Sequence, residues 1–307
     1  MALIRNDKTG SRVVLRSRHL VGRSAAVDTT VDTAGVSGEH AAFTWTGHGW
    51  ELRDLGSTNG TFVGDRQVGA GERVKLAPGD RIGFGGTSDP WLVDTVAAPS
   101  VVAWSGEDLI EGEGPFLALP SLDDPDVVIE RDDMHWVLVQ NDERTPLSDR
   151  ETVVVRGRAW EIGLPTALAA TAPLGDASQL KTLMERSLSG TSLAFAVSGD
   201  EEYLELTVTV AGEPNKLPPK AHQYLLLVLA RSRMEDNEGP ASEQGWVYSS
   251  DLRKMLACSA NQFHVMCHRC RREFEKLGVT DAPEIIERRT TSRQVRIGVA
   301  RLVVGRI

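Results

Sequence analysis

The chain has 307 residues, of which 41% are hydrophobic and 25% are charged, and its net charge is −9; this size favours two or three packed domains over one. No apolar run approaches the roughly 20 residues of a membrane-spanning helix, and the N-terminal residues show no signal-peptide pattern. All three cysteines lie in the last fifty residues, an odd and clustered set that excludes a disulfide framework and favours a reducing cytoplasm.

The net charge is divided unevenly along the chain. Residues 1–215 carry 18 Lys and Arg against 33 Asp and Glu, whereas residues 216–307 carry 16 against 10. An acidic front and a basic tail predict different partners, and nucleic acid is a candidate partner only for the tail.

The first 97 residues read as short strands separated by turns. Runs such as Ala42–Trp45, Trp50–Leu52 and Val74–Leu76 are rich in β-formers and are bounded by Gly, Asn, Asp or Pro. Many short strands with glycine turns and no helical period predict a β-sandwich.

Polar motifs follow one another on the loops between these strands. They are Gly22-Arg23, Ser37-Gly38-Glu39-His40 and Thr58-Asn59-Gly60. Arginine offers a fixed fork of donors, and the hydroxyl and amide groups add further donors, so the loops suit an anion. The three motifs, in this order and at this spacing, resemble the forkhead-associated (FHA) domain, a reader of phosphothreonine peptides.

The FHA resemblance implies a role for each polar residue. Arg23 and Ser37 would contact the phosphate with Thr58 beside them, Asn59 would hold the peptide backbone, and His40 would brace the serine loop. An FHA-shaped sandwich with an inactive site is the alternative. Ser37 and His40 do not form a nucleophile and base, because no orienting carboxylate is implied. No other nucleophile–base pair, nucleotide loop or metal motif is visible, so we expect no enzyme and no cofactor.

The region 98–165 is again β-rich, and we predict a middle domain there. His135–Leu138 and Trp160–Gly163 echo segments of the first domain, which raises the hypothesis of a degenerate FHA-like repeat without a phosphate site. Residues 166–190 read as a linker that contains a short helix from Asp176 to Leu188, whose leucines recur at helical spacing.

The tail, residues 191–307, combines strands with helices. Strands are expected at Leu193–Val197 and Tyr203–Val210, and a helix at Lys220–Arg233. A helix that starts at the capping box Ser259-x-x-Gln262 and stops near Gly278 follows a short helix from Asp251. Its apolar residues share one face, and we expect its charged residues and histidines on the opposite, outward side. A hairpin with basic residues at its tip ends the pattern at residues 284–297.

This arrangement resembles the OmpR-type winged helix-turn-helix of bacterial response regulators, in which the third helix enters the DNA major groove. The resemblance implies base or phosphate contacts by residues of that helix and the hairpin, namely His264, His268, Arg269, Arg271, Arg272, Arg288, Arg289 and Arg293. A winged helix that contacts protein is the alternative. A zinc site at Cys267-x-x-Cys270 with the two histidines is disfavoured, because Cys270 would point into the core and the histidines outward.

The sequence therefore predicts a multidomain protein, mainly β and then α+β, with an FHA sandwich at 1–97, a middle domain at 98–165, a linker at 166–190 and a winged helix at 191–307. We expect a cytoplasmic, phosphothreonine-dependent transcriptional regulator. Its expected partners are a Thr-phosphorylated protein or a Ser/Thr kinase, double-stranded DNA and a second copy of the chain as a homodimer. A phospho-dependent scaffold, whose winged helix contacts protein, is the alternative function.

Overall fold

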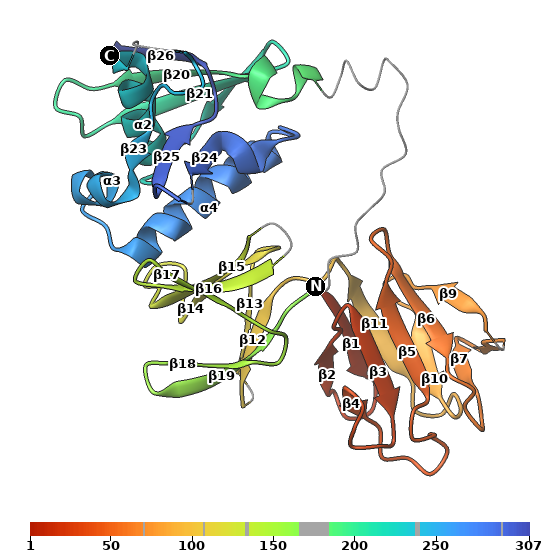
Figure 1. Ribbon diagram of the computed structural model, residues 1–307. Coiled ribbons are helices and arrows are strands. Elements are labelled where there is room, and N and C mark those ends of the chain that lie inside the picture. The colour runs from red at the N-terminus through yellow and green to blue at the C-terminus, as the bar shows by residue number, and fades with distance from the viewer. Residues whose placement is uncertain (70, 107, 133–134, 166–183, 237–239, 290) are drawn as a thin grey trace. The chain divides into compact units, whose positions relative to one another are not determined.

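The computed structural model of the chain (Figure 1) describes residues 1–69, 71–106, 108–132, 135–165, 184–236, 240–289 and 291–307. Contacts divide it into two compact units. One contains Met1–Leu117, Ile129–Leu138 and Arg144–Ala172, and the other contains Ala118–Val128, Val139–Glu143 and Pro173–Ile307. Within the described residues, no helix is long and apolar enough to cross a membrane.

The N-terminal residues form two antiparallel-rich sheets around one core. The six-stranded sheet has the order β2-β1-β11-β10-β7-β8, and the five-stranded sheet has the order β4-β3-β5-β6-β9. Ile4, Phe43, Trp50, Leu52 and Ile82, which come from both sheets, are completely buried in that core. The predicted mainly-β sandwich is confirmed. The strands are β1 (Ala2–Asn6), β2 (Arg12–Val14), β3 (Arg18–Gly22), β4 (Thr29–Thr30), β5 (Ala41–Trp45), β6 (Trp50–Asp54), β7 (Thr61–Val63), β8 (Arg66–Gln67), β9 (Arg73–Lys75), β10 (Arg81–Phe84) and β11 (Trp91–Val96).

The strands from 102 to 163 form two four-stranded sheets, ordered β13-β12-β19-β18 and β14-β15-β16-β17. The first of these sheets repeats the plan of β2-β1-β11-β10: an opening hairpin whose first strand pairs antiparallel with the last strand of the region. This shared strand order supports the hypothesis of an FHA-like repeat. The strands are β12 (Val102–Ser105), β13 (Asp108–Glu111), β14 (Phe116–Leu119), β15 (Val127–Asp132), β16 (His135–Gln140), β17 (Glu143–Pro146), β18 (Thr152–Val155) and β19 (Arg158–Gly163).

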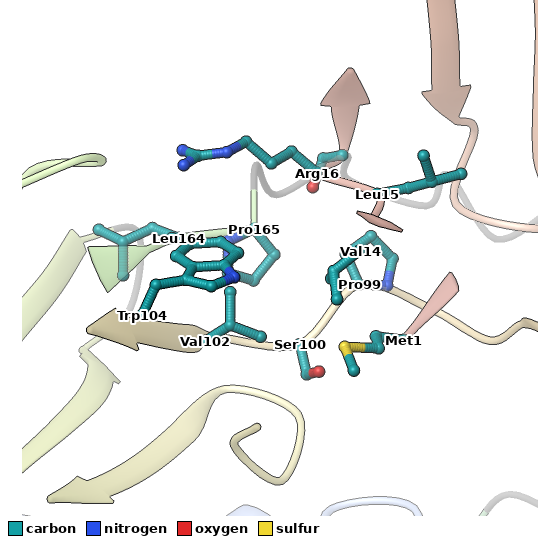
Figure 2. A pocket seen from close by; sticks show the side chains of 12 residues that line it. Met1, Val14, Leu15, Arg16, Pro99, Ser100, Val102, Trp104, Leu164 and Pro165 are labelled. Atoms are coloured by element: carbon teal, nitrogen blue, oxygen red, sulfur yellow. The ribbon is translucent and has the colours of Figure 1, made fainter. Parts of the chain in front are cut away.

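Within the first unit, the sheet of β12, β13, β18 and β19 is joined to the first sandwich by charged side chains. The guanidinium of Arg16 lies 2.8 Å from the Glu161 carboxylate and 4.8 Å from the centre of the Trp104 ring, and Arg150 pairs with Asp28. The cavity beside Arg16 and Trp104 (Figure 2) measures about 10 Å³, which is room for at most one water molecule. This cavity is therefore too small to hold a ligand.

The C-terminal residues form a four-stranded sheet, ordered β22-β21-β20-β26, and a three-stranded sheet, ordered β23-β25-β24. Helix α2 contacts both sheets, through β21 and β26 of the first and β25 of the second. The predicted strands at 193–197 and 203–210 are confirmed, but the helix predicted from Lys220 begins at Gln223. The elements are η1 (Leu188–Gly190), β20 (Ser192–Val197), β21 (Leu204–Val210), β22 (Glu213–Leu217), α2 (Gln223–Glu235), β23 (Val247–Tyr248), α3 (Ser249–Met255), α4 (Ala260–Lys276), η2 (Ala282–Ile285), β24 (Ile286–Arg289), β25 (Gln294–Ile297) and β26 (Arg301–Arg306).

Helix α4 begins and ends where the sequence predicts. Its capping box is formed, since the Ser259 hydroxyl accepts from the Gln262 N–H at 3.2 Å and the Gln262 side chain accepts from the Ser259 N–H at 2.9 Å. Gly278 follows the helix with a φ of +77°, a conformation that favours glycine. Cys267 and Cys270 are fully buried in the core, as predicted for small hydrophobic side chains.

Two predictions, the exposure of two histidines in the tail and the helix in the linker, are not confirmed by the structure. The outward exposure predicted for His264 and His268 is wrong, because both are buried, with 6% and 5% of their surface exposed. The helical pattern places them away from the apolar core, but it cannot show that other chain segments cover that side. The helix predicted from Asp176 to Leu188 lies almost wholly outside the described residues, and the predicted domain bounds stay predictions.

Candidate functional site

The loop after β3 and the loop before β5 are joined by backbone hydrogen bonds. The Arg23 N–H donates to the Ser37 carbonyl at 2.8 Å, and the Ser24 N–H donates to the Gly38 carbonyl at 3.0 Å. Gly22 permits this approach, since a Cβ at this position would lie 2.0 Å from the Gly38 carbonyl oxygen. The glycine before Arg23 is thus required by packing between the two loops.

The loop between β6 and β7 joins the same group through Ser37. The Thr58 N–H donates to the Ser37 hydroxyl oxygen at 3.0 Å, and the two hydroxyl oxygens lie 3.4 Å apart. The Arg23 side chain is exposed and, within the part of the chain that the structure describes, forms no hydrogen bond or ion pair. The structure therefore brings Arg23, Ser37 and Thr58 together on adjoining loops, with a free guanidinium at the edge.

His40 lies under these loops and is fully buried. Its Nδ1 accepts the Ser37 N–H at 3.0 Å, and its Nε2 lies 3.1 Å from the Gly60 carbonyl. This pattern requires a neutral ring that carries its proton on Nε2, and burial lowers the pKa of His40 accordingly. His40 thus connects the serine loop with the Asn59-Gly60 loop and makes no surface contact.

Asp54 is a positioning residue, and the sequence motifs assign it no role. One carboxylate oxygen accepts the N–H groups of Gly56 and Ser57 at 2.8 and 2.9 Å. The other accepts the hydroxyls of Ser57 and Thr61, each at 2.6 Å. Burial raises the pKa of Asp54, but these hydrogen bonds outweigh it and hold the pKa below the ordinary value. An Asp followed by Gly and Ser is the signal of such a turn.

Asn59 is exposed and already has one partner in the site. Its side-chain amide donates to the Gly35 carbonyl at 2.9 Å, which orients the side chain and leaves its carbonyl oxygen for a further donor. All five residues predicted for this site therefore lie on connected loops, four near the surface and His40 beneath them.

We expect acid to destabilise this sandwich through its buried histidines. Burial lowers the pKa of His19 from 6.5 to about 4, and the pKa of His40 is lowered too. A lowered pKa gives stability that is present above pH 6.5 and is lost as the pH falls toward 4. At about 1.4 kcal/mol for each pH unit, His19 alone would remove about 3 kcal/mol.

Denaturant unfolding at a series of pH values measures this loss. His19→Asn should flatten the pH dependence, whereas His48→Gln, at an exposed histidine, should leave it unchanged. A free energy of unfolding that does not change between pH 6.5 and 4.5 would contradict the expectation.

Comparison with known proteins decides the identity of this region, because residues 19–85 match the family model of the FHA domain. Residues 19–85 are an FHA domain. No curated protein matches the chain. The FhaA FHA domain, solved in complex with the intracellular domain of Rv3910, is 29% identical, with a TM-score of 0.28, and the match covers 30% of this chain and 99% of that one.

A second similar structure belongs to a longer protein, of which the match covers a quarter. Mycobacterium tuberculosis EmbR, solved with a low-affinity phosphopeptide, is 25% identical, with a TM-score of 0.29, and the match covers 32% of this chain but 25% of that chain. The FHA assignment of residues 19–85 rests on the family model.

The residues predicted to bind DNA have mostly protein partners in the described structure. Arg269 pairs with Asp123 at 2.8 Å and Arg272 with Glu275 at 2.6 Å. Arg271 donates to the Pro283 carbonyl at 3.0 Å and so braces η2 against α4.

The three arginines predicted on the hairpin differ in their surroundings. Arg288 reaches Nδ1 of the buried His264 at 3.5 Å, and Arg289 forms a pair with Glu243 at 2.9 Å while lying 4.1 Å from the centre of the Trp246 ring. Arg293 is exposed at the hairpin tip. The eight predicted residues therefore do not form one open basic surface.

Proposed function

We propose that the FHA domain binds a protein phosphorylated on threonine. The observation that carries the proposal is the exposed guanidinium of Arg23, which has no partner among the described residues, beside the hydrogen-bonded hydroxyls of Ser37 and Thr58. A phosphothreonine carries nearly two negative charges and three acceptor oxygens. A guanidinium and short hydroxyls donate charge-assisted hydrogen bonds to those oxygens, and the side-chain carbonyl oxygen of Asn59 can accept from a peptide N–H.

A peptide comparison tests this proposal directly. Binding of one peptide is measured by calorimetry in its phosphothreonine, phosphoserine and unphosphorylated forms. We expect binding of the phosphothreonine form and at least a hundredfold weaker binding of the unphosphorylated form. Equal affinity for the two would refute the proposal and favour an inactive FHA fold.

The C-terminal region supports a second proposal, that it is a winged helix which binds DNA. Its support is the order of elements, in which α4 follows α2 and α3 and precedes the β24–β25 hairpin (Figure 1), together with the excess of basic residues after 215. The protein would then couple a phosphothreonine signal to transcription in the cytoplasm, without catalysis or a cofactor. The scaffold, in which this region contacts protein, stays the alternative.

A salt titration separates DNA binding from protein binding. We expect the full chain to bind a duplex at low salt with an affinity that falls steeply as salt is added, since phosphate contacts release counterions. Arg293→Ala should weaken binding several-fold and lower the salt slope by about one. Arg12→Ala, an equal charge change at an exposed residue of β2, is the control. If no duplex binds at low salt, the proposed DNA binding is refuted and the scaffold function remains.

A further inference from the structure

Within the second unit, the loop between β14 and β15 lies against helix α4. The Asn261 side-chain amide donates to the backbone carbonyls of Asp126 at 2.5 Å and Pro125 at 3.4 Å. Two turns further along the helix, Arg269 pairs with the Asp123 carboxylate at 2.8 Å. The loop residues 121–126 are therefore attached to α4 at two points.

These points define one line on the helix surface. Asn261, Val265 and Arg269 recur every four residues, so they lie above one another on the same face. Val265, between the two attachment points, is 2% exposed. Phe263, Cys267, Cys270 and Phe274 occupy the other side of α4 and are buried in the core. The loop thus covers the side of α4 that faces away from the core of its own domain.

A third attachment lies on the preceding helix. Arg253 of α3 pairs with Asp142 at 2.5 Å, in the turn between β16 and β17. Both side chains of this pair are partly buried, and Asp142 belongs to the same compact unit as α3 and α4. Two separate segments of the region before the linker therefore hold basic side chains of two consecutive helices.

The covered side is the one that DNA would need. In a winged helix, the third helix enters the major groove with the residues that face away from the core. Here that side carries an acidic loop, whose Asp123 carboxylate occupies the Arg269 guanidinium as a phosphate would. A duplex and the loop therefore cannot contact this side of α4 at the same time.

We propose that residues 121–126 and Asp142 compete with DNA for α3 and α4, so that this chain masks its own DNA-binding surface. The proposal rests on the proposed DNA binding. The contact is suited to release: Asp123 is 90% exposed in its pair with Arg269, and such surface pairs contribute little stability. Asp124, Asn141 and Gln262 at the helix start line a polar cleft of about 410 Å³, so the loop and the helix are not closely packed over their whole contact.

The double variant Asp123→Asn/Asp142→Asn in the full chain tests the mask without altering the winged helix. Asn adopts the positive φ of position 142 readily, so we expect the variant to fold. Its affinity for a 30-base-pair duplex of mixed sequence at low salt should rise about tenfold. Asp32→Asn/Asp65→Asn makes the same charge change at exposed FHA residues and should leave the affinity unchanged. An equal rise in both variants would show a general charge effect and overturn the proposal.

Chemical labelling reports the mask independently of DNA. Diethyl pyrocarbonate modification of the buried His268, followed by mass spectrometry, should rise several-fold in Asp123→Asn/Asp142→Asn and not in the control. Labelling that stays at the wild-type level overturns the mask whatever the DNA affinity. Increased labelling with unchanged binding of the duplex shows that the loop does not compete with DNA. Increased labelling with no duplex binding in any variant supports the mask and refutes the proposed DNA binding.

Discussion

Arg23→Ala should abolish measurable binding of a phosphothreonine peptide, with a loss of about a hundredfold or more. The guanidinium of Arg23 is the exposed cation at the joined loops, and its side chain has no other partner within the described structure. Hydrogen bonds to charged groups contribute about 1.5–3 kcal/mol each, so two such bonds to one phosphate account for the expected factor. Calorimetry with the phosphorylated peptide measures it, and thermal unfolding should show little change, because the side chain is exposed.

Arg12→Ala is the matched control for this measurement. It removes the same charge from an exposed arginine of β2, an edge strand of the six-stranded sheet, whereas the Ser37 loop precedes β5 of the five-stranded sheet. Its peptide affinity should equal that of the wild type. Retained binding in Arg23→Ala, or the same loss in both variants, would show that Arg23 does not contact the phosphate.

The grouping of the candidate-site residues on neighbouring loops could be predicted from the sequence because these residues lie in short motifs, while their binding role stays a prediction. Gly22-Arg23, Ser37 with His40, and Asn59-Gly60 each occupy one loop, and adjoining strands bring those loops together. The role of Asp54 was not predicted because its carboxylate contacts only neighbouring residues of the β6–β7 connection. It accepts four hydrogen bonds, from Gly56, Ser57 and Thr61. Its neighbours Gly56 and Ser57 are ordinary turn residues, and the pattern alone does not show that one carboxylate organises them.

In residues 191–307, local sequence patterns predict the ends of a helix but not the contacts between segments distant in the sequence. The capping box and Gly278 set the ends of α4 by local chemistry, and the structure confirms both. The burial of His264 involves a segment distant in the sequence, since Arg288 of the hairpin lies 3.5 Å from its ring nitrogen. Helical periodicity cannot reveal such a contact. Strand β26 was not predicted for the same reason, since it pairs in parallel with β20, more than a hundred residues earlier.

Gly22→Ala should destabilise the FHA domain and remove phosphopeptide binding together. The added Cβ would lie 2.0 Å from the Gly38 carbonyl oxygen and 3.0 Å from the Glu39 Cα, both backbone atoms that no side-chain rotation can move. The loops must separate, which breaks the Arg23–Ser37 and Ser24–Gly38 hydrogen bonds. Overpacking of this kind costs roughly 2–3 kcal/mol, equivalent to about 10–20 °C in the melting temperature of a domain of this size.

Gly38→Ala distinguishes this steric cause from a general sensitivity of the loop. Gly38 lies across the same contact, but a Cβ there would meet no atom within 4 Å and its φ is not positive. We expect this variant to melt within about 2 °C of the wild type and to bind the phosphopeptide with unchanged affinity. Differential scanning calorimetry of the two full-length variants makes the comparison. If both glycines tolerate alanine equally, the close approach of the two loops is not what positions Arg23 and Ser37. If only Gly22→Ala fails, the spacing between the backbones of these loops is itself a requirement of the site.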